Sequence, residues 1–271
     1  MRQARSVIMK DEDRVVLPKI SVVTCSLNQA RYLEATIRSV LDQGYPNLEY
    51  VVIDGGSEDG SVEIIKKYSE RLAYWVSEPD KGQTDALIKG FERTSGEILA
   101  WLCSDDLYEP NALHEAADVL LRNPQWQVVY GDSIWIDADG RPIRPKKEIG
   151  FNRFVWLYSG NYIPQPSTFW RRDIYERVGG LDARWAHAMD ADLWIRFAEV
   201  AALHHVPRAW SRMRHYPEQK NRRLRKEFDA EGALIEGRYL PPDEPSWRRR
   251  SKRFAARSLR VASKLARGAY W

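Results

Sequence analysis

The chain has 271 residues, of which 44% are hydrophobic and 11% aromatic, which is ample for a folded core and excludes a disordered protein. Its formal charge of +4 comes from the C-terminal end, because residues 248–271 contain nine Lys or Arg and no acidic residue. Residues 1–247 therefore carry 33 basic and 38 acidic side chains, a net charge of −5 that disfavours nucleic acid as a partner.

Neither a membrane-spanning segment nor a secretion signal is apparent. No apolar run approaches the roughly 20 residues that a span requires, and the start MRQARSVIMK is not followed by an apolar signal core. The two cysteines, Cys25 and Cys103, each follow a predicted buried strand, which suits reduced core residues better than a disulfide. We therefore expect a soluble, cytoplasmic protein without a cysteine-bound metal.

The first hundred residues alternate strand and helix patterns. Residues 1–18 are charged and aperiodic and predict a loose N-terminal arm. After them, apolar runs predict strands and stripes of i, i+4, i+7 spacing predict helices, in the order strand 20–24, helix 30–44, strand 50–54, helix 61–68, strand 72–76, helix 83–93 and strand 97–102.

This alternation predicts an α/β fold with a mostly parallel central sheet flanked by helices. The predicted strands are apolar almost throughout, as strands are when helices cover both faces of a sheet. Ligands of such sheets bind beyond the carboxyl ends of the strands. We expect the polar residues that follow the strands to meet at that edge, namely Thr24, Ser26, Asn28, Asp54, Asp105 and Asp106.

The second half is less regular. Its patterns predict, in order, a helix 110–123, a strand 126–132, a hairpin 133–143 that turns at Asp139 and Gly140, an irregular aromatic wall 150–188, a helix 190–200 and a strand 202–206. Residues 247–271 predict a basic helix with Phe254, Ser258, Val261 and Leu265 along one side. Such a helix suits an anionic membrane surface, and it equally suits packing on the body or on a partner.

Paired carboxylates after a buried strand suit a divalent cation. Mg²⁺ typically takes one or two carboxylates and fills its other positions with phosphate oxygens and water, so Asp105 and Asp106 can hold a metal that holds a diphosphate. The alternative is a helix cap or turn, since a helix is predicted soon afterwards. The stretch VVIDGGSEDGS leaves a similar choice between an Asp-Gly turn and a loop that approaches a ligand.

Three stretches together resemble glycosyltransferase family 2, and they span about residues 19–215. They are KISVVTCSLNQARYLEATIRSVLDQGYPNLEYVVIDGGSEDGS, SEPDKGQTDALIKGFERTSGEILAWLCSDDLYEP and GGLDARWAHAMDADLWIRFA. The resemblance implies a Rossmann-like glycosyltransferase-A fold, an inverting transferase and a nucleoside-diphosphate sugar donor. It also implies a catalytic domain 19–215, with a nucleotide-sugar half 19–106 and an acceptor half 107–215, before a basic helical extension 216–271.

The resemblance also assigns roles to individual residues. It implies that the nucleotide sugar contacts Thr24, Ser26, Asn28, Asp54, Lys81, Asp85 and Asp105. It implies that Asp106 ligates Mn²⁺ or Mg²⁺, that His215 reaches the metal or the diphosphate, and that Asp190 is the catalytic base. Two alternatives stay open, because Asp190 also suits the start of a helix and His215 a loop.

Two departures from the family pattern concern the chemistry. The family often has Asp or Asn where this chain has Cys103, and its catalytic pair is commonly Glu-Asp where this chain has Met189 before Asp190. We expect a metal-dependent hexosyl- or N-acetylhexosaminyltransferase that acts on a saccharide or lipid-linked saccharide in polysaccharide, glycan or glycolipid assembly, in the cytoplasm or at the inner face of the membrane. The alternatives are a weak or inactive nucleotide-sugar-binding protein and, less favoured, a sugar nucleotidyltransferase.

Overall fold

The computed structural model describes residues 16–269. The expected arm at residues 1–18 therefore lies mostly outside the described residues. Residues 16–19 precede the first strand without regular structure.

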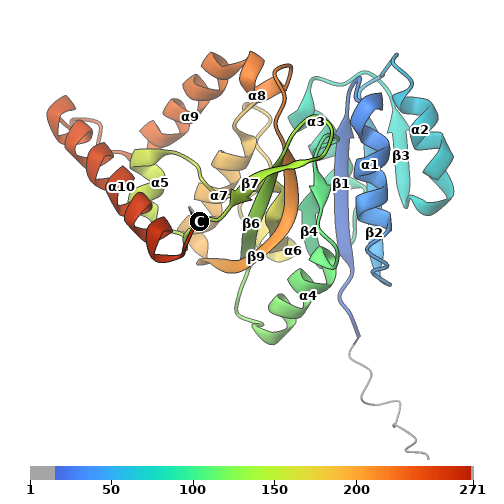
Figure 1. The fold of residues 1–271 in the computed structure, drawn as a ribbon, viewed down its shortest axis with the longest axis horizontal. Coiled ribbons are helices and arrows are strands. Elements are labelled where there is room, and N and C mark those ends of the chain that lie inside the picture. The colour runs from blue at the N-terminus through green and yellow to red at the C-terminus, as the bar shows by residue number, and fades with distance from the viewer. Residues whose placement is uncertain (1–15, 270–271) are drawn as a thin grey trace, which may run out of the picture.

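One sheet runs through the molecule, with strand order β3-β2-β1-β4-β8-β6-β9-β5 and β7 paired to β6 (Figure 1). The strands are β1 (Ile20–Ser26), β2 (Leu48–Asp54), β3 (Tyr74–Ser77), β4 (Ile98–Trp101), β5 (Leu107–Tyr108), β6 (Val128–Ile136), β7 (Pro142–Lys146), β8 (Thr168–Arg171) and β9 (Leu203–Arg214).

Helices cover both faces of this sheet and continue beyond it at the C-terminal end (Figure 1). They are α1 (Ala30–Leu41), α2 (Ser61–Tyr68), α3 (Gln83–Glu92), α4 (Ala112–Arg122), α5 (Arg153–Ser159), α6 (Arg172–Arg177), α7 (Met189–Val200), α8 (Lys220–Arg223), α9 (Arg225–Tyr239) and α10 (Ser246–Ala266), with short 3-10 turns η2 (Ser69–Arg71) and η3 (Gln165–Ser167).

The half of the sheet built from β1 to β4 is parallel, as expected. The registers pair Ser26 with Asp54 and Asp54 with Ser77, so the carboxyl ends of β1, β2 and β3 are level. Strands β1 and β4 are buried along their whole length, because α1 and α3 lie on opposite faces of them. Because both faces of these strands are covered, their sequences are continuous apolar runs.

The other half mixes directions and departs from the expectations in several places. Strands β8, β7 and β5 pair antiparallel to their neighbours, whereas β6 and β9 pair parallel. Strand β9 extends to Arg214, well beyond the expected end at residue 206, and the segment expected to be an irregular wall contains α5, β8 and α6. The expected hairpin is confirmed, with Gly140 at φ +85° in the turn between β6 and β7.

Two apolar clusters form the core, one on each face of the sheet. In one of them the rings of Trp101 and Trp194 stack with centroids 5.5 Å apart. Helix α3 lies close to the sheet because Gly90 has no side chain, and a Cβ at that position would lie 2.4 Å from Val23 Cγ1. This approach sets the position of the α3 N-terminus above the end of β1.

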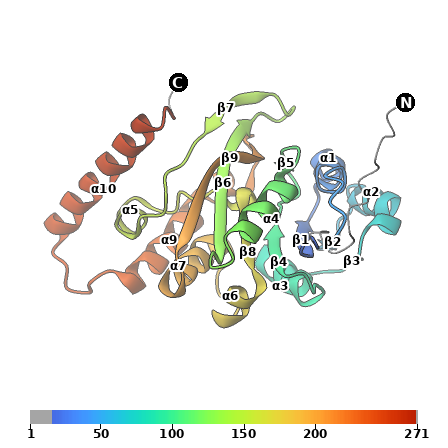
Figure 2. The ribbon, with the colours of Figure 1, turned by 90° about the horizontal axis from the view of Figure 1, so that it is seen from below.

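The C-terminal helices form a layer beyond the sheet, and α10 lies against α5 (Figure 2). The body holds α10 through a fully buried carboxylate, Glu148, which accepts hydrogen bonds from Arg260 at 3.1 Å and Lys264 at 2.8 Å. These charges and that of Lys146 lower the pKa of Glu148 against the effect of burial. Within residues 16–269, no helix has the length and apolar character needed to cross a bilayer.

Candidate active site

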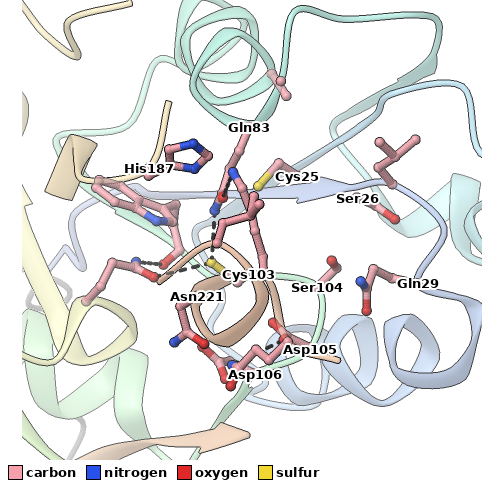
Figure 3. Close-up of a pocket in the computed structure, with 18 of the residues that line it drawn as sticks. Cys25, Ser26, Gln29, Gln83, Cys103, Ser104, Asp105, Asp106, His187 and Asn221 are labelled. Carbon is pink, nitrogen blue, oxygen red and sulfur yellow. Dashed lines mark hydrogen bonds between the residues drawn. The ribbon is translucent and has the colours of Figure 1, made fainter. Parts of the chain in front are cut away.

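A pocket of about 550 Å³ lies beyond the carboxyl ends of β1 and β4, where the parallel half of the sheet was expected to bind its ligand (Figure 3). We call it the first pocket. The residues that line it and carry the argument below are Ser26, Gln83, Cys103, Asp105, Asp106, Gln165, Met189, Asp190, Tyr216, Gln219 and Lys220. In Figure 3, Ser26 and His187 lie on opposite sides of the pocket, and both carboxylates of the Asp105-Asp106 pair lie together below Cys103.

The turn after β4 places both carboxylates in this pocket. The backbone N–H of Asp106 donates to the carbonyl of Cys103 at 3.0 Å, which turns the chain directly after the strand. Asp106 Oδ1 accepts the backbone N–H of Arg214 at 2.8 Å, and Asp105 Oδ2 accepts the hydroxyl of Tyr216 at 2.9 Å. Burial raises the pKa of both carboxyls, and the charge of Asp105 raises that of Asp106 further.

These two carboxylates fit a hard divalent cation. Among residues 16–269, no hydrogen-bond donor reaches Asp105 Oδ1 or Asp106 Oδ2, so each side chain keeps one free oxygen ligand. No cluster of three or more His, Cys, Asp and Glu side chains in the described range is arranged to hold a metal. A pair of carboxylates is the number that Mg²⁺ commonly uses when phosphate oxygens complete its coordination.

Asp190 faces the same pocket from the first turn of α7. Asn161 Nδ2 donates to its Oδ2 at 2.9 Å, and burial raises the pKa of Asp190 to about 6. The loop before it is held from α9, where Glu231 accepts three backbone N–H groups, those of residues 186, 187 and 188, at 2.8 to 3.0 Å. A carboxylate with this pKa is largely ionised at neutral pH and is basic enough to accept a proton.

Amide and thiol side chains also line the pocket. Gln83 Nε2 donates to Cys103 Sγ at 3.4 Å, and Gln165 Nε2 donates to the carbonyl of Trp101 at 2.7 Å. Both cysteines are free thiols, as expected. The hydroxyl of Ser26 is buried and has no partner in the described part of the chain, so it is available to a ligand.

Thr24 and Asp54 lie at the same edge of the sheet but do not line the first pocket. The hydroxyl of Thr24 is buried and accepts that of Tyr50 at 3.0 Å. Both oxygens of Asp54 are engaged by the turn that follows β2, where Ser57 donates through its backbone and its hydroxyl and Ser77 donates at 2.7 Å. A nucleotide contact by either side chain stays a prediction.

Asn28, Lys81 and Asp85 surround the pocket without lining it. Asn28, at φ +53°, accepts the backbone N–H of Glu58 at 3.0 Å and so joins the loops after β1 and β2. Asp85 accepts the backbone N–H of Lys81 at 3.1 Å at the start of α3, which lowers its pKa. These contacts shape the loops that carry the lining residues, and the expected nucleotide contacts again stay predictions.

His215 lies on a second pocket instead of the first. Its ring is 4.3 Å from that of Trp135, and Arg222 donates to its Nδ1 at 3.3 Å. Burial is the main reason that the pKa of His215 is lowered. Asp190 lines both pockets, so His215 lies on the side of the site that Asp190 shares with the second pocket, and its metal role stays a prediction.

Sequence reasoning missed several residues of the first pocket. Gln83 lies within the quoted DKGQTDA stretch, and Tyr216 directly follows His215, so both had a signal in their neighbours. Gln165, Gln219 and Lys220 had none, because they lie in or next to η3 and α8, which are too short to show a periodic pattern. Lys220 Nζ donates to Gln83 Oε1 at 3.2 Å, which joins the start of α8 to the start of α3 beside the pocket.

Comparison with known proteins places this chain in a family. Residues 21–179 match the family model described as glycosyl transferase family 2. The chain is similar to an uncharacterized glycosyltransferase of Mycobacterium tuberculosis, 31% identical over 185 residues, which cover 68% of this chain and 70% of the relative. It is also similar to one of Rickettsia typhi, 28% identical over 199 residues, which cover 69% of this chain and 61% of that relative.

Solved structures share the fold. TarS of S. aureus, in complex with UDP-GlcNAc, has a TM-score of 0.65 at 18% identity and covers 85% of this chain and 69% of its own. The mannosyltransferase PcManGT from Pyrobaculum calidifontis, in complex with GDP-Man and Mn²⁺, has a TM-score of 0.61 at 19% identity and covers 94% of this chain and 76% of its own. These likenesses confirm the expected glycosyltransferase-A fold.

Proposed function

Because the chain belongs to glycosyltransferase family 2, we propose that it transfers a sugar from a nucleoside-diphosphate sugar to an acceptor hydroxyl with inversion at the anomeric carbon. The observation that carries the proposal is the first pocket, which brings Asp105 and Asp106 from the end of β4 together with Asp190 from the start of α7. Residues 19–215 are the proposed catalytic domain, and residues 216–271 are its basic extension.

Asp190 is the proposed general base. Inversion requires the acceptor hydroxyl to attack from the face opposite the leaving nucleoside diphosphate, so the base and the diphosphate site must lie apart within one cavity. Asp190 takes the hydroxyl proton, and Asn161 orients its carboxylate through the 2.9 Å hydrogen bond. Positioned bases of this kind contribute about 10²- to 10⁴-fold in rate.

Asp105 and Asp106 are the proposed ligands of Mn²⁺ or Mg²⁺, through their free oxygens. The ion would supply Lewis-acid stabilisation of the departing diphosphate. The unpartnered hydroxyl of Ser26 is the proposed contact to the nucleotide sugar, next to the end of β2. The chain holds the two carboxylates in place through hydrogen bonds from the Arg214 backbone to Asp106 and from the Tyr216 hydroxyl to Asp105.

The donor test is a panel of nucleoside-diphosphate sugars, each incubated with the protein and Mn²⁺, Mg²⁺ or chelator. Slow release of the nucleoside diphosphate, detected by mass spectrometry, supports a transferase through its background hydrolysis. Turnover that depends on pyrophosphate identifies a sugar nucleotidyltransferase, and binding without any turnover identifies an inactive nucleotide-sugar-binding protein. Either of the last two results contradicts the proposal.

The acceptor is proposed to be a saccharide or lipid-linked saccharide in polysaccharide, glycan or glycolipid assembly, at the cytoplasmic face of the membrane. Helix α10 supports the membrane contact. Its side away from the body exposes Trp247 by 63%, Phe254 by 74%, Val261 by 46% and Leu265 by 45%. These residues are spaced by 7, 7 and 4 positions and therefore share one face of the helix, beside exposed arginines that suit anionic lipid.

Sedimentation with anionic vesicles tests this contact. Replacing Trp247 and Phe254 by Ser should reduce salt-sensitive binding, whereas Leu234→Ser on α9, which removes a side chain that is 64% exposed, should not. Substitution is preferable to removal of α10, because removal would strip Arg260 and Lys264 from buried Glu148. Equal binding of wild type and the double variant would eliminate the membrane contact.

A further inference from the structure

A second pocket, of about 1030 Å³, lies on the other side of Asp190. It is bounded by the end of β6, by α5, by the start of α7 and by the C-terminal helices α9 and α10. Asp190, Asn221 and Phe228 line both pockets. The proposed base therefore stands between two cavities, and only the first of them contains the paired carboxylates.

The second pocket carries positive charge that the chain does not neutralise. Four arginines line it, and Arg225 alone among them is paired, with Asp229 at 2.9 Å. Within residues 16–269, Arg222, Arg253 and Arg257 have no carboxylate within 4.0 Å. Elsewhere on α10, Arg249 pairs with Glu244 and Arg260 with Glu148, whereas Arg248 and Arg250 are exposed and line neither pocket. The three unpaired arginines of the second pocket differ from these in lining one cavity.

The acidic groups on the same pocket do not cancel this charge. Glu236 and Asp190 line it, and burial raises the pKa of both carboxyls, Asp190 to about 6. Three unpaired guanidinium groups thus face two carboxyls, which leaves a net positive charge even when both carboxyls are ionised. Arginine on a concave surface is the side chain best suited to phosphate, because its planar fork donates two parallel hydrogen bonds to the oxygens.

Unsatisfied polar atoms of the second pocket indicate a ligand with hydroxyl groups. Buried atoms without a partner in the described part of the chain include Trp135 Nε1, Trp156 Nε1, Ser159 Oγ and His215 Nε2, all from residues that line this pocket. Buried polar groups are normally hydrogen-bonded. Sugar hydroxyls satisfy such donors, and the rings of Trp135 and Tyr158 add apolar surface for a sugar face.

We infer that the second pocket binds the acceptor, and that the acceptor is a saccharide that carries a phosphate or diphosphate. Arg222, Arg253 and Arg257 hold the phosphate, and the acceptor hydroxyl faces Asp190. This inference rests on the proposed function. In the transfer, the acceptor oxygen forms the new bond to the anomeric carbon, the bond from that carbon to the nucleoside diphosphate breaks with its electron pair on the diphosphate, and the hydroxyl proton passes to Asp190.

The test measures binding of phosphate probes to the full chain by calorimetry, with a chelator present so that a metal does not recruit them to the first pocket. The probes are geranyl diphosphate, glucose 1-phosphate and, without phosphate, methyl glucoside. The variant is Arg253→Gln with Arg257→Gln. The matched control is Arg248→Gln with Arg250→Gln, two exposed arginines of the same helix that do not line the pocket.

We expect the pocket variant to weaken binding of at least one phosphate probe about tenfold or more, since two charge-assisted contacts are lost. The control should stay within about twofold of wild type. Tighter binding of geranyl diphosphate would identify a lipid-linked source of the phosphate, and tighter binding of glucose 1-phosphate a soluble one. Equal weakening by both double variants, no weakening, or no binding of either phosphate probe would overturn the inference.

Release of nucleoside diphosphate from the donor alone separates this inference from the proposed function. The pocket variant should keep that release at the wild-type rate, because Arg253 and Arg257 are absent from the first pocket. Normal release with unchanged probe affinity would refute the acceptor pocket and leave the transferase standing. Absence of release by the wild type with every donor would refute the transferase itself.

Discussion

Replacing Asp190 by Asn separates catalysis from stability. Burial raises the pKa of this carboxyl from 3.8 to about 6, which means that its ionisation costs the folded protein at most about 3 kcal/mol at pH values well above 6. Asn has nearly the same shape and keeps an oxygen that accepts from Asn161. We therefore expect Asp190→Asn to lose about 10²- to 10⁴-fold in kcat and to gain stability at pH 8.

The sign of the stability change depends on pH. The pKa of Asp190 is higher in the folded than in the unfolded state, so ionisation destabilises the folded wild type only at pH values where the unfolded chain is ionised. The stability that Asp190→Asn gains over the wild type therefore grows between pH 3.8 and about 6 and vanishes at lower pH. Below about pH 6 the wild type also loses its base, and kcat/KM should fall about tenfold from pH 7 to pH 5. The variant's residual rate should lack this dependence.

Urea unfolding at pH 8 and pH 4, with donor turnover across the pH range, measures both effects. A control is Asp182→Asn, where the Arg184 guanidinium holds the pKa of Asp182 below its ordinary value. That change should lower stability by up to about 1 kcal/mol and leave turnover intact. Wild-type kcat in Asp190→Asn, or a variant that loses activity and stability together, would refute the assignment of Asp190 as a buried base.

Three further predictions concern residues that hold the site. Asp106→Asn should weaken Mn²⁺ binding in the presence of nucleoside diphosphate at least about tenfold, as read by calorimetry, and unchanged affinity would remove Asp106 from the ligands. Gly90→Ala should lower the free energy of unfolding in urea by about 1–3 kcal/mol, because the added Cβ would lie 2.4 Å from Val23 Cγ1. As the control, Gly237→Ala on α9, where a Cβ would meet nothing within 4 Å, should raise it by about 0.4–1 kcal/mol. Glu231→Gln should lower kcat at unchanged donor KM, because it loosens the loop before Asp190, and an unchanged kcat would limit Glu231 to a structural role.

The parallel half of the fold could be predicted because each of its strands carries its own signal. A strand buried on both faces is a continuous apolar run, and the helices between such strands show a clear stripe. Strand β5 (Leu107–Tyr108) has no local signal, since it consists of two residues and pairs with Ser211 and Arg212, about a hundred residues away. Helix α5 was missed because its aromatic residues show no polar face, although Asn152 caps it by accepting from Val155 at 3.0 Å.

The site likewise combines residues that have a local sequence signal with residues whose orientation depends on distant contacts. Ser26, Asp105 and Asp106 could be located because residues that follow parallel strands reach a common edge, and all three line the first pocket. Asp54 obeys the same rule of position, but the turn after β2 and Ser77 on a neighbouring strand use both of its oxygens. Which way a side chain turns at that edge depends on contacts between strands, and those contacts leave no pattern in the sequence.

The second pocket lay beyond sequence reasoning for a related reason. Its arginines come from the basic extension 216–271, and the sequence does not distinguish those that pair with the body from those that stay free. The fold makes the distinction, because Arg260 reaches Glu148 while Arg253 and Arg257 face the cavity beside Asp190.

Anomalous diffraction at the manganese edge tests the central claim most directly, on crystals that contain Mn²⁺ and the nucleoside diphosphate selected by the donor panel. The account predicts one strong peak within bonding distance of Asp105 and Asp106, with the diphosphate bound to it and Asp190 on the opposite side of the first pocket. A nucleotide bound elsewhere, or manganese bound away from both carboxylates, would contradict the account.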